Sequence, residues 1–114
     1  MVFKKKNTPE SLLKKAAVQL LKIHGIYNFP LVAAMGSPPG LPDRVAIRDG
    51  KFIAIEFKRP KSLTESGRMR NQGELTDDQI RVKEQIESAG GLYITCRSLD
   101  DLYEHLNLPG RLFP

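Results

Sequence analysis

Two carboxylates and one lysine within residues 42–58 suggest a definite chemistry. Asp43 follows a proline, and Glu56 and Lys58 stand two residues apart further along the chain. Carboxylates are hard oxygen donors that suit Mg²⁺ or Mn²⁺, and an ammonium group can orient an attacking water or neutralise charge on a phosphate. If the fold brings the three side chains together, they form the set that metal-assisted cleavage of a phosphodiester requires.

A β-hairpin is predicted to bring these three side chains together. The Asp-Gly pair at residues 49–50 is a two-residue turn signal between two runs with the composition of strands. Side chains alternate between the two faces of a strand, so the apolar residues of the second run face the core, and Glu56 and Lys58 lie opposite them. Asp43, at the start of the first strand, then lies near both. The predicted strands are 44–48 and 51–58, and the core-facing residues of the second are Ile53, Ile55 and Phe57.

Each of these residues also has a purely structural interpretation. Asp43 after a proline is a common turn residue, because an aspartate side chain accepts hydrogen bonds from its own backbone. Glu56 and Lys58 are alternatively a solvated pair on an exposed strand face. The elements predicted around the hairpin bear on which of the two interpretations applies.

Three helices are predicted around the hairpin. The first begins after Thr8 and ends before Gly25, because apolar residues recur at helical spacing between a capping threonine and a glycine. Capping patterns and glycines predict the second at 77–89 and the third from 99 to about 106. The predicted apolar stripe of the first helix is Leu12, Leu13, Ala16, Ala17, Leu20 and Leu21.

The remaining segments supply strands and a loop. The apolar run 26–35 contains Pro30, so it predicts an edge strand or an irregular extended segment. A Gly- and Pro-rich loop at 36–40 precedes the first carboxylate and either lets the backbone approach a ligand closely or only connects two elements. The run 92–96 predicts a buried strand with Cys96, the only cysteine, as a small core residue. This order of elements predicts an α/β fold with helices covering a central sheet.

The ordered motifs resemble the PD-(D/E)xK nuclease superfamily and, within it, the VRR-NUC family. The resemblance extends from Glu10 to about Leu106 and implies a restriction-endonuclease-like core, with a central mixed β-sheet flanked by helices. It also implies that residues 1–114 form a single nuclease domain. The matching pieces are Gly40-Leu-Pro-Asp43, Glu56-Phe-Lys58, Gln79 and Gly90-Gly91, followed by residues 92–98 and Asp100-Asp101.

The resemblance gives roles to the residues of the hairpin. Asp43 and Glu56 are expected to bind Mg²⁺ or Mn²⁺ directly, and the backbone carbonyl of Phe57 is expected to be a further ligand. Lys58 is expected to orient the nucleophile.

Two residues outside the hairpin have roles that the sequence leaves open. Glu10 matches a glutamate that reaches the metal or its waters in the superfamily, and alternatively it only complements the dipole of the first helix. Gln79 matches a residue near the catalytic centre, and alternatively its side chain closes a capping box with Thr76.

The charge of the chain favours a polyanionic partner. A net charge of +5 comes from 18 Lys and Arg against 13 Asp and Glu, and such an excess suits DNA. Basic residues gather at Lys4–Lys6 and at 58–70, where they follow a phosphate backbone or belong to a solubilising tail and to a flexible loop at 61–75. His24 and His105 lack metal-ligand spacing. No apolar stretch has the length of a membrane span and none follows the basic start as in a signal peptide, so a cytoplasmic protein of a bacterial or phage-infected cell is expected.

The function that the resemblance implies is a divalent-metal-dependent, structure-selective DNA endonuclease. Small free-standing members of the family resemble enzymes that resolve four-way (Holliday) junctions, and paired cuts need two sites, so a homodimer is expected. Its contact is expected at the apolar segment 26–35. The alternatives are a flap or nicking nuclease acting as a monomer, and a nucleic-acid-binding module without catalysis.

Overall fold

The computed structural model describes residues 9–59 and 74–111. Three predicted features lie outside the described residues. They are the basic residues Lys4–Lys6, the capping Thr8, and the loop 61–75 except for its last two residues. Within the described ranges, no helix has the length and apolar character that a membrane crossing needs. The elements are α1 Pro9–Ile23, β1 Tyr27–Pro30, β2 Arg44–Arg48, β3 Lys51–Phe57, α2 Asp77–Ser88, β4 Leu92–Cys96 and α3 Leu99–His105.

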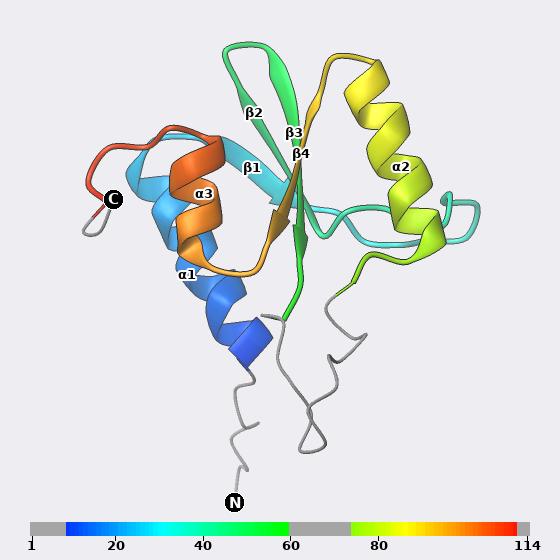
Figure 1. The fold of residues 1–114 in the computed structure, drawn as a ribbon, viewed down its shortest axis with the longest axis horizontal. Helices are drawn as coiled ribbons and strands as arrows, with labels where there is room; N and C mark the ends of the chain where they lie inside the picture. Colours follow the sequence, from blue (N-terminus) through cyan, green and yellow to red (C-terminus); the bar gives the residue numbers. More distant parts are fainter. Residues whose placement is uncertain (1–8, 60–73, 112–114) are drawn as a thin grey trace, which may run out of the picture.

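The four strands of the described residues form one mixed sheet in the order β1-β2-β3-β4. β2 pairs antiparallel with β1 and β3, whereas β4 runs parallel to β3, because the chain crosses over through α2 before returning to the sheet. Helices α1 and α3 lie on one side of the sheet and α2 on the other (Figure 1). The predicted α/β fold with a central mixed sheet flanked by helices is therefore confirmed.

The hairpin of β2 and β3 has the predicted turn. Asp49 and Gly50 both have positive φ, 53° and 76°, as a two-residue turn that matches the twist of the strands requires. The register pairs Arg44 with Ile55. Asp43, one residue before β2, therefore lies next to Glu56 near the end of β3.

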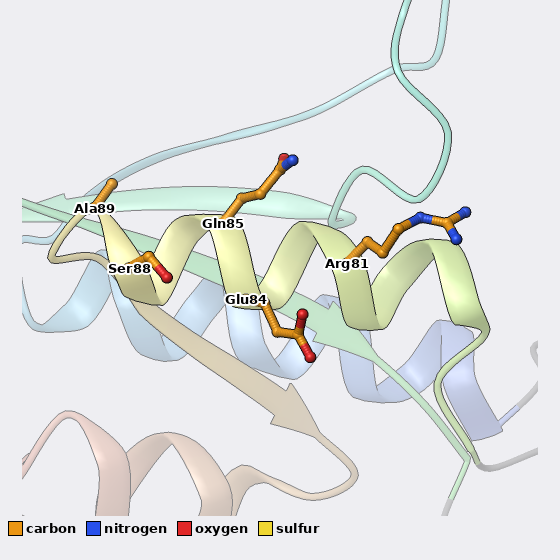
Figure 2. Close-up of a pocket in the computed structure, with 5 residues that line it drawn as sticks. All are labelled: Arg81, Glu84, Gln85, Ser88 and Ala89. Carbon is orange, nitrogen blue, oxygen red and sulfur yellow. The ribbon is translucent and has the colours of Figure 1, made fainter.

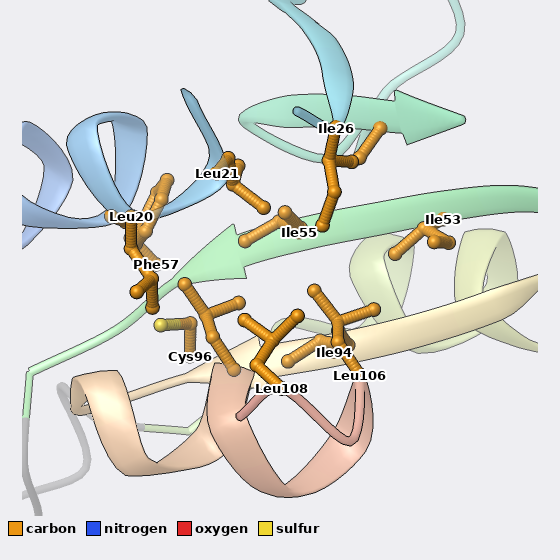
Figure 3. Close-up of a cluster of buried hydrophobic side chains, with 13 residues drawn as sticks. Leu20, Leu21, Ile26, Ile53, Ile55, Phe57, Ile94, Cys96, Leu106 and Leu108 are labelled. Carbon is orange, nitrogen blue, oxygen red and sulfur yellow. The ribbon is translucent and has the colours of Figure 1, made fainter. Parts of the chain in front are cut away.

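One face of the sheet packs against α1 and α3 to form the core. The core-facing residues of β3 are those that the alternation predicted, and they meet side chains of α1, β4 and the C-terminal segment (Figure 3). In α1 the buried stripe runs through Leu13 and Ala17. Leu12 belongs to the apolar pattern but is 53% exposed, because neighbouring helical positions lie about 100° apart and Leu12 lies off the buried face. The labelled residues of Figure 3 are Leu20, Leu21, Ile26, Ile53, Ile55, Phe57, Ile94, Cys96, Leu106 and Leu108.

The segment 26–35 forms the edge strand β1 and an irregular stretch after it, as the proline in its middle predicted. Tyr27 and Phe29 of β1 form an aromatic pair, with ring centroids 5.8 Å apart. Tyr27, Val32 and Met35 are exposed. This part of the molecule therefore presents an unpaired strand edge together with apolar side chains.

The glycine-rich loop before Asp43 packs directly on the start of α2. A Cβ atom on Gly40 would lie 2.5 Å from the backbone carbonyl carbon and oxygen of Asp78 and 2.8 Å from the backbone nitrogen of Gln79. Gly40 also has a φ of +83°, which side chains other than hydrogen disfavour. Glycine at this position allows the loop to touch α2, and the contact fixes α2 against the segment that carries Asp43.

Gly40→Ala should therefore destabilise the fold more than Gly36→Ala. Gly36 has a similar φ of +89°, but a Cβ atom there meets no atom within 4 Å. Gly36→Ala should cost about 1–2 kcal/mol from backbone strain alone, and Gly40→Ala about 3 kcal/mol or more, because backbone atoms must also move. Urea unfolding followed by circular dichroism measures both values. Equal losses in the two variants would show that the loop does not depend on this contact.

Candidate active site

Asp43 and Glu56 are held together by hydrogen bonds exchanged between their two strands. The backbone N–H of Asp43 donates to Glu56 Oε2 at 3.1 Å, and the backbone N–H of Phe57 donates to Asp43 Oδ2 at 2.8 Å. Each carboxylate thus accepts a hydrogen bond from the strand of the other. The predicted approach of the two acidic residues is confirmed, and a backbone N–H group holds one oxygen of each carboxylate.

Glu56 is a buried acidic group, with only 5% of its surface exposed. The alternative interpretation of Glu56 as a solvated residue on an exposed strand face is therefore wrong. Helix α2 and the loop 31–42 cover this face of the sheet. Burial, followed by the negative charge of Asp43, raises the pKa of Glu56 to about 7, while the Lys58 ammonium lowers it. A carboxyl group kept where its charge is unfavourable is typical of functional sites.

The Phe57 carbonyl is oriented by the sheet. The backbone N–H of Lys58 donates to the Cys96 carbonyl of β4 at 3.0 Å. In a planar trans peptide the carbonyl of Phe57 points opposite to that N–H, away from β4 and toward the side on which Asp43 lies. Two carboxylates and one carbonyl on the same side make a hard oxygen donor set that fits Mg²⁺ or Mn²⁺.

Two cavities meet at Glu56. The first, which we call the lysine-side cavity, has a volume of about 280 Å³ and is lined by Glu10, Glu56, Phe57, Lys58 and Arg59. The second, which we call the loop-side cavity, has a volume of about 490 Å³ and is lined by residues of the segment 31–43, by Glu56, and by Thr76, Asp78 and Gln79. Lys58 therefore lines the same cavity as Glu56 and Phe57, whereas Asp43 lines the loop-side cavity.

Glu10 lies in the wall of the lysine-side cavity, where it pairs with a cation. Lys14 Nζ is 3.4 Å from Glu10 Oε1 and 5.9 Å from the centre of the Phe57 ring. In residues 9–59 and 74–111, no three His, Cys, Asp or Glu side chains are grouped closely enough to hold a metal. The structure thus places Glu10 beside the site and brings only Asp43 and Glu56 together as a carboxylate pair.

Gln79 has both of the contacts that the sequence set as alternatives. Its backbone N–H donates to Thr76 Oγ1 at 3.2 Å, and its side-chain Oε1 accepts from the Thr76 N–H at 2.9 Å, which completes the capping box. Its Nε2 donates to Glu56 Oε1 at 3.0 Å. The two ends of one amide group therefore connect the start of α2 to the buried carboxylate.

The chain matches no family model and no curated protein. The resemblance in the motifs stays a prediction, and the residues have to be judged by what they contact.

Tyr93 of β4 is a neighbour of the site that the sequence did not indicate. It pairs with Ala54 of β3, so its side chain lies on the same face as Glu56, and it is 6% exposed. Its hydroxyl has no hydrogen-bond partner among the described residues. Burial, and then the negative charges of Glu56 and Asp43, raise the pKa of Tyr93. The apolar run of β4 predicted burial but carried no information about this neighbour.

A larger hollow of about 540 Å³ lies on the outer surface of α2 and has no comparable chemistry. Figure 2 shows its five lining side chains projecting from one helix in different directions rather than converging on a point. They belong to Arg81, Glu84, Gln85, Ser88 and Ala89. The candidate active site is therefore the carboxylate pair with its two cavities.

In the metal-free protein, Glu56 should contribute less to stability as the pH rises. Its pKa of about 7 lies above the ordinary value of 4.5, so the stability from the protonated group is fully present below pH 4.5 and is lost as the pH rises through 7. The loss is on the order of 3 kcal/mol, at about 1.4 kcal/mol per pH unit. Glu56→Gln should therefore become more stable relative to wild type across this range, as urea unfolding in EDTA can measure.

Glu84→Gln is the matched control, because Glu84 is an exposed carboxylate on α2. Its stability should follow that of wild type across the same pH range. If the free energies of unfolding of wild type and Glu56→Gln differ by the same amount at every pH, the pKa of Glu56 is not raised.

Proposed function

We propose that this chain is a divalent-metal-dependent DNA endonuclease, with Asp43, Glu56 and the Phe57 carbonyl as the groups that hold Mg²⁺ or Mn²⁺. The main support is the exchange of hydrogen bonds that presses two carboxylates together beside Lys58, with one of them buried. Repulsion between two such groups is relieved by a cation. A purely structural role does not explain why both Asp43 and Glu56 are acidic, because an uncharged amide oxygen would also accept the backbone hydrogen bonds.

The residues of the site have separate tasks in this proposal. A bound Mg²⁺ or Mn²⁺ supplies Lewis acidity toward the phosphate and lowers the pKa of a water. Lys58, in the lysine-side cavity, donates hydrogen bonds to the attacking water or to a phosphate oxygen, where charge develops during cleavage. Gln79 holds one oxygen of Glu56 and so orients the carboxylate. Glu10, which pairs with Lys14, also lines the lysine-side cavity and adds a negative charge there.

DNA is the polyanion that suits the charge of the chain and of the cavity. The net charge is +5, and Lys58 and Arg59 line the lysine-side cavity. Cationic side chains that contact phosphates give affinity without reading sequence. The proposed substrate is therefore distinguished by its shape, which agrees with the structure-selective cleavage that the motifs imply.

Cleavage of a four-way junction by a homodimer is the specific activity that we propose. One site cuts one strand, whereas resolving a junction needs two related cuts. The edge strand β1, which contains the exposed Tyr27, and the exposed Met35 further along the same segment form the proposed contact between the two copies. Sedimentation equilibrium with and without junction DNA tests this part. A strict monomer that still cleaves flaps would replace the junction by the flap or nicking alternative.

Asp43→Asn and Glu56→Gln should each abolish cleavage while DNA binding persists, because each removes a charged oxygen ligand but no phosphate contact. The assay uses labelled four-way junction, flap and linear duplex with Mn²⁺, Mg²⁺ or EDTA. Lys58→Ala should lower the rate by about a hundredfold to a thousandfold. The control Lys51→Ala removes an exposed lysine at the hairpin turn and should keep full activity.

The same assay separates the nuclease from the alternative without catalysis. A binding module would retard all three DNAs and cut none of them in any metal. Wild-type rates in Asp43→Asn or Glu56→Gln would instead disprove the proposed metal site.

Gln79→Ala and Thr76→Ala should both lower stability, and Gln79→Ala should lower cleavage more than Thr76→Ala. Both changes break the capping box, which costs about 1 kcal/mol, but only the first removes the hydrogen bond to Glu56. Thermal melting and cleavage rates below the melting temperature give the two readouts. If the two variants cleave equally well, the contact with Glu56 has no catalytic importance and Gln79 is only a cap.

A further inference from the structure

The loop-side cavity differs in its chemistry from the lysine-side cavity, although Glu56 lines both. Among the described residues that line it there is no lysine, arginine or histidine. Its charged groups are the carboxylates of Asp43, Glu56 and Asp78, and Asp78 pairs with Arg81 outside the cavity. In the proposed function Asp43 and Glu56 hold the metal, and no cationic side chain among the described lining residues is left to pair with a second phosphate. The cavity therefore does not continue the phosphate site around Lys58.

One wall of the loop-side cavity, formed by residues 31–41, carries mainly apolar side chains and is preformed. Gly40 touches the backbone of α2 at a distance that admits no side chain. Ser37 closes a tight turn, because its N–H donates to the Ala34 carbonyl at 2.9 Å and its Oγ accepts from the Ala34 N–H at 3.0 Å. The wall therefore keeps its shape without a ligand. Its apolar side chains come from Leu31, Ala33, Ala34, Pro38, Pro39 and Leu41.

An apolar wall that faces hydrogen-bond acceptors fits a nucleobase. A base has apolar faces, and its edges carry amino and imino donors that suit carboxylate and amide oxygens. A volume of about 490 Å³ lies in the range of pockets that hold small ligands. A sugar-phosphate backbone fits less well, because its charge meets no cationic side chain among the described lining residues.

We propose that the loop-side cavity receives the base of an unstacked nucleotide next to the scissile phosphate of a DNA strand. This inference rests on the proposed nuclease function, since it places the scissile phosphate in the lysine-side cavity. The phosphate and the flanking base then lie on opposite sides of Glu56. A base inside a continuous duplex has to be unstacked at a cost of a few kcal/mol, whereas unstacking a base at a branch costs less. The cavity thus gives a physical origin for selectivity toward branched DNA.

The test replaces bases one at a time near the cut. In a branched substrate, each nucleotide flanking the cut is replaced by an abasic site, and kcat/KM is measured. At one position the loss of the base should lower kcat/KM about tenfold or more, the range found for lost base contacts. In a parallel binding assay in EDTA with Lys58→Ala, 2-aminopurine at the same position should become more fluorescent, because it leaves the stack.

Variants of the wall connect the effect to this cavity. Ala33→Leu combined with Ala34→Leu fills part of the cavity from two exposed positions and should reduce both the abasic effect and the 2-aminopurine signal at least fivefold. Val32→Met, on the same segment but outside the lining, should leave both unchanged. Circular dichroism and melting confirm that both proteins are folded.

Failure of this inference can be told apart from failure of the nuclease proposal. Metal-dependent cleavage that tolerates an abasic site at every flanking position, with unchanged 2-aminopurine fluorescence, overturns the base site alone. A fluorescence rise at one nucleotide that the two leucines remove, in a protein that cuts no DNA, supports the base site and overturns the nuclease. Signals that the leucine pair leaves intact place the base elsewhere and also overturn the assignment.

Discussion

The exchange of hydrogen bonds between Asp43 and the end of β3 is the contact on which the site depends. The ladder between β2 and β3 ends at Arg44 and Ile55, so the next N–H groups need other partners. The two carboxylates supply them, because Glu56 accepts from Asp43 and Asp43 accepts from Phe57. The side chains that carry the proposed chemistry therefore complete the sheet, and their positions are as rigid as the strands.

The part of this arrangement that the sequence predicted depends on local rules. An Asp-Gly turn fixes the register of its hairpin, and side-chain alternation then determines which residues face the core, so the approach of Asp43 to Glu56 followed from a short segment. The capping box at Thr76 was equally local. The burial of Glu56 was not predictable, because it depends on α2 and the loop 31–42, which lie far from β3 in sequence. The contact of Gly40 with Asp78 brings that loop and α2 together.

Gln79 shows why sequence patterns left two interpretations open. A capping pattern uses the Oε1 acceptor of the side chain and says nothing about the Nε2 donor, which the fold directs to Glu56. The side-chain amide of Gln79 therefore makes the local capping contact and the tertiary contact with Glu56 at the same time. The place of Tyr93 was not predicted for a related reason, since an apolar strand gives no sign of which neighbour each side chain meets. The pairing of Lys14 with Glu10 follows from their spacing of four residues on a helix, but the approach of Lys14 to the Phe57 ring depends on the fold.

The charge of the chain is distributed so that Glu56 lies at a boundary. Lys58 and Arg59 line one cavity, whereas the other contains only acidic charged groups among its described lining residues. On our proposal, a strand that crosses this boundary has to place a phosphate on one side and a neutral base on the other. The same hydrogen bond from Gln79 then supports both tasks, because it ties Glu56 to the helix that borders the base. A displacement of α2 would therefore disturb the carboxylate and the cavity together, and selection of the substrate would be coupled to its cleavage.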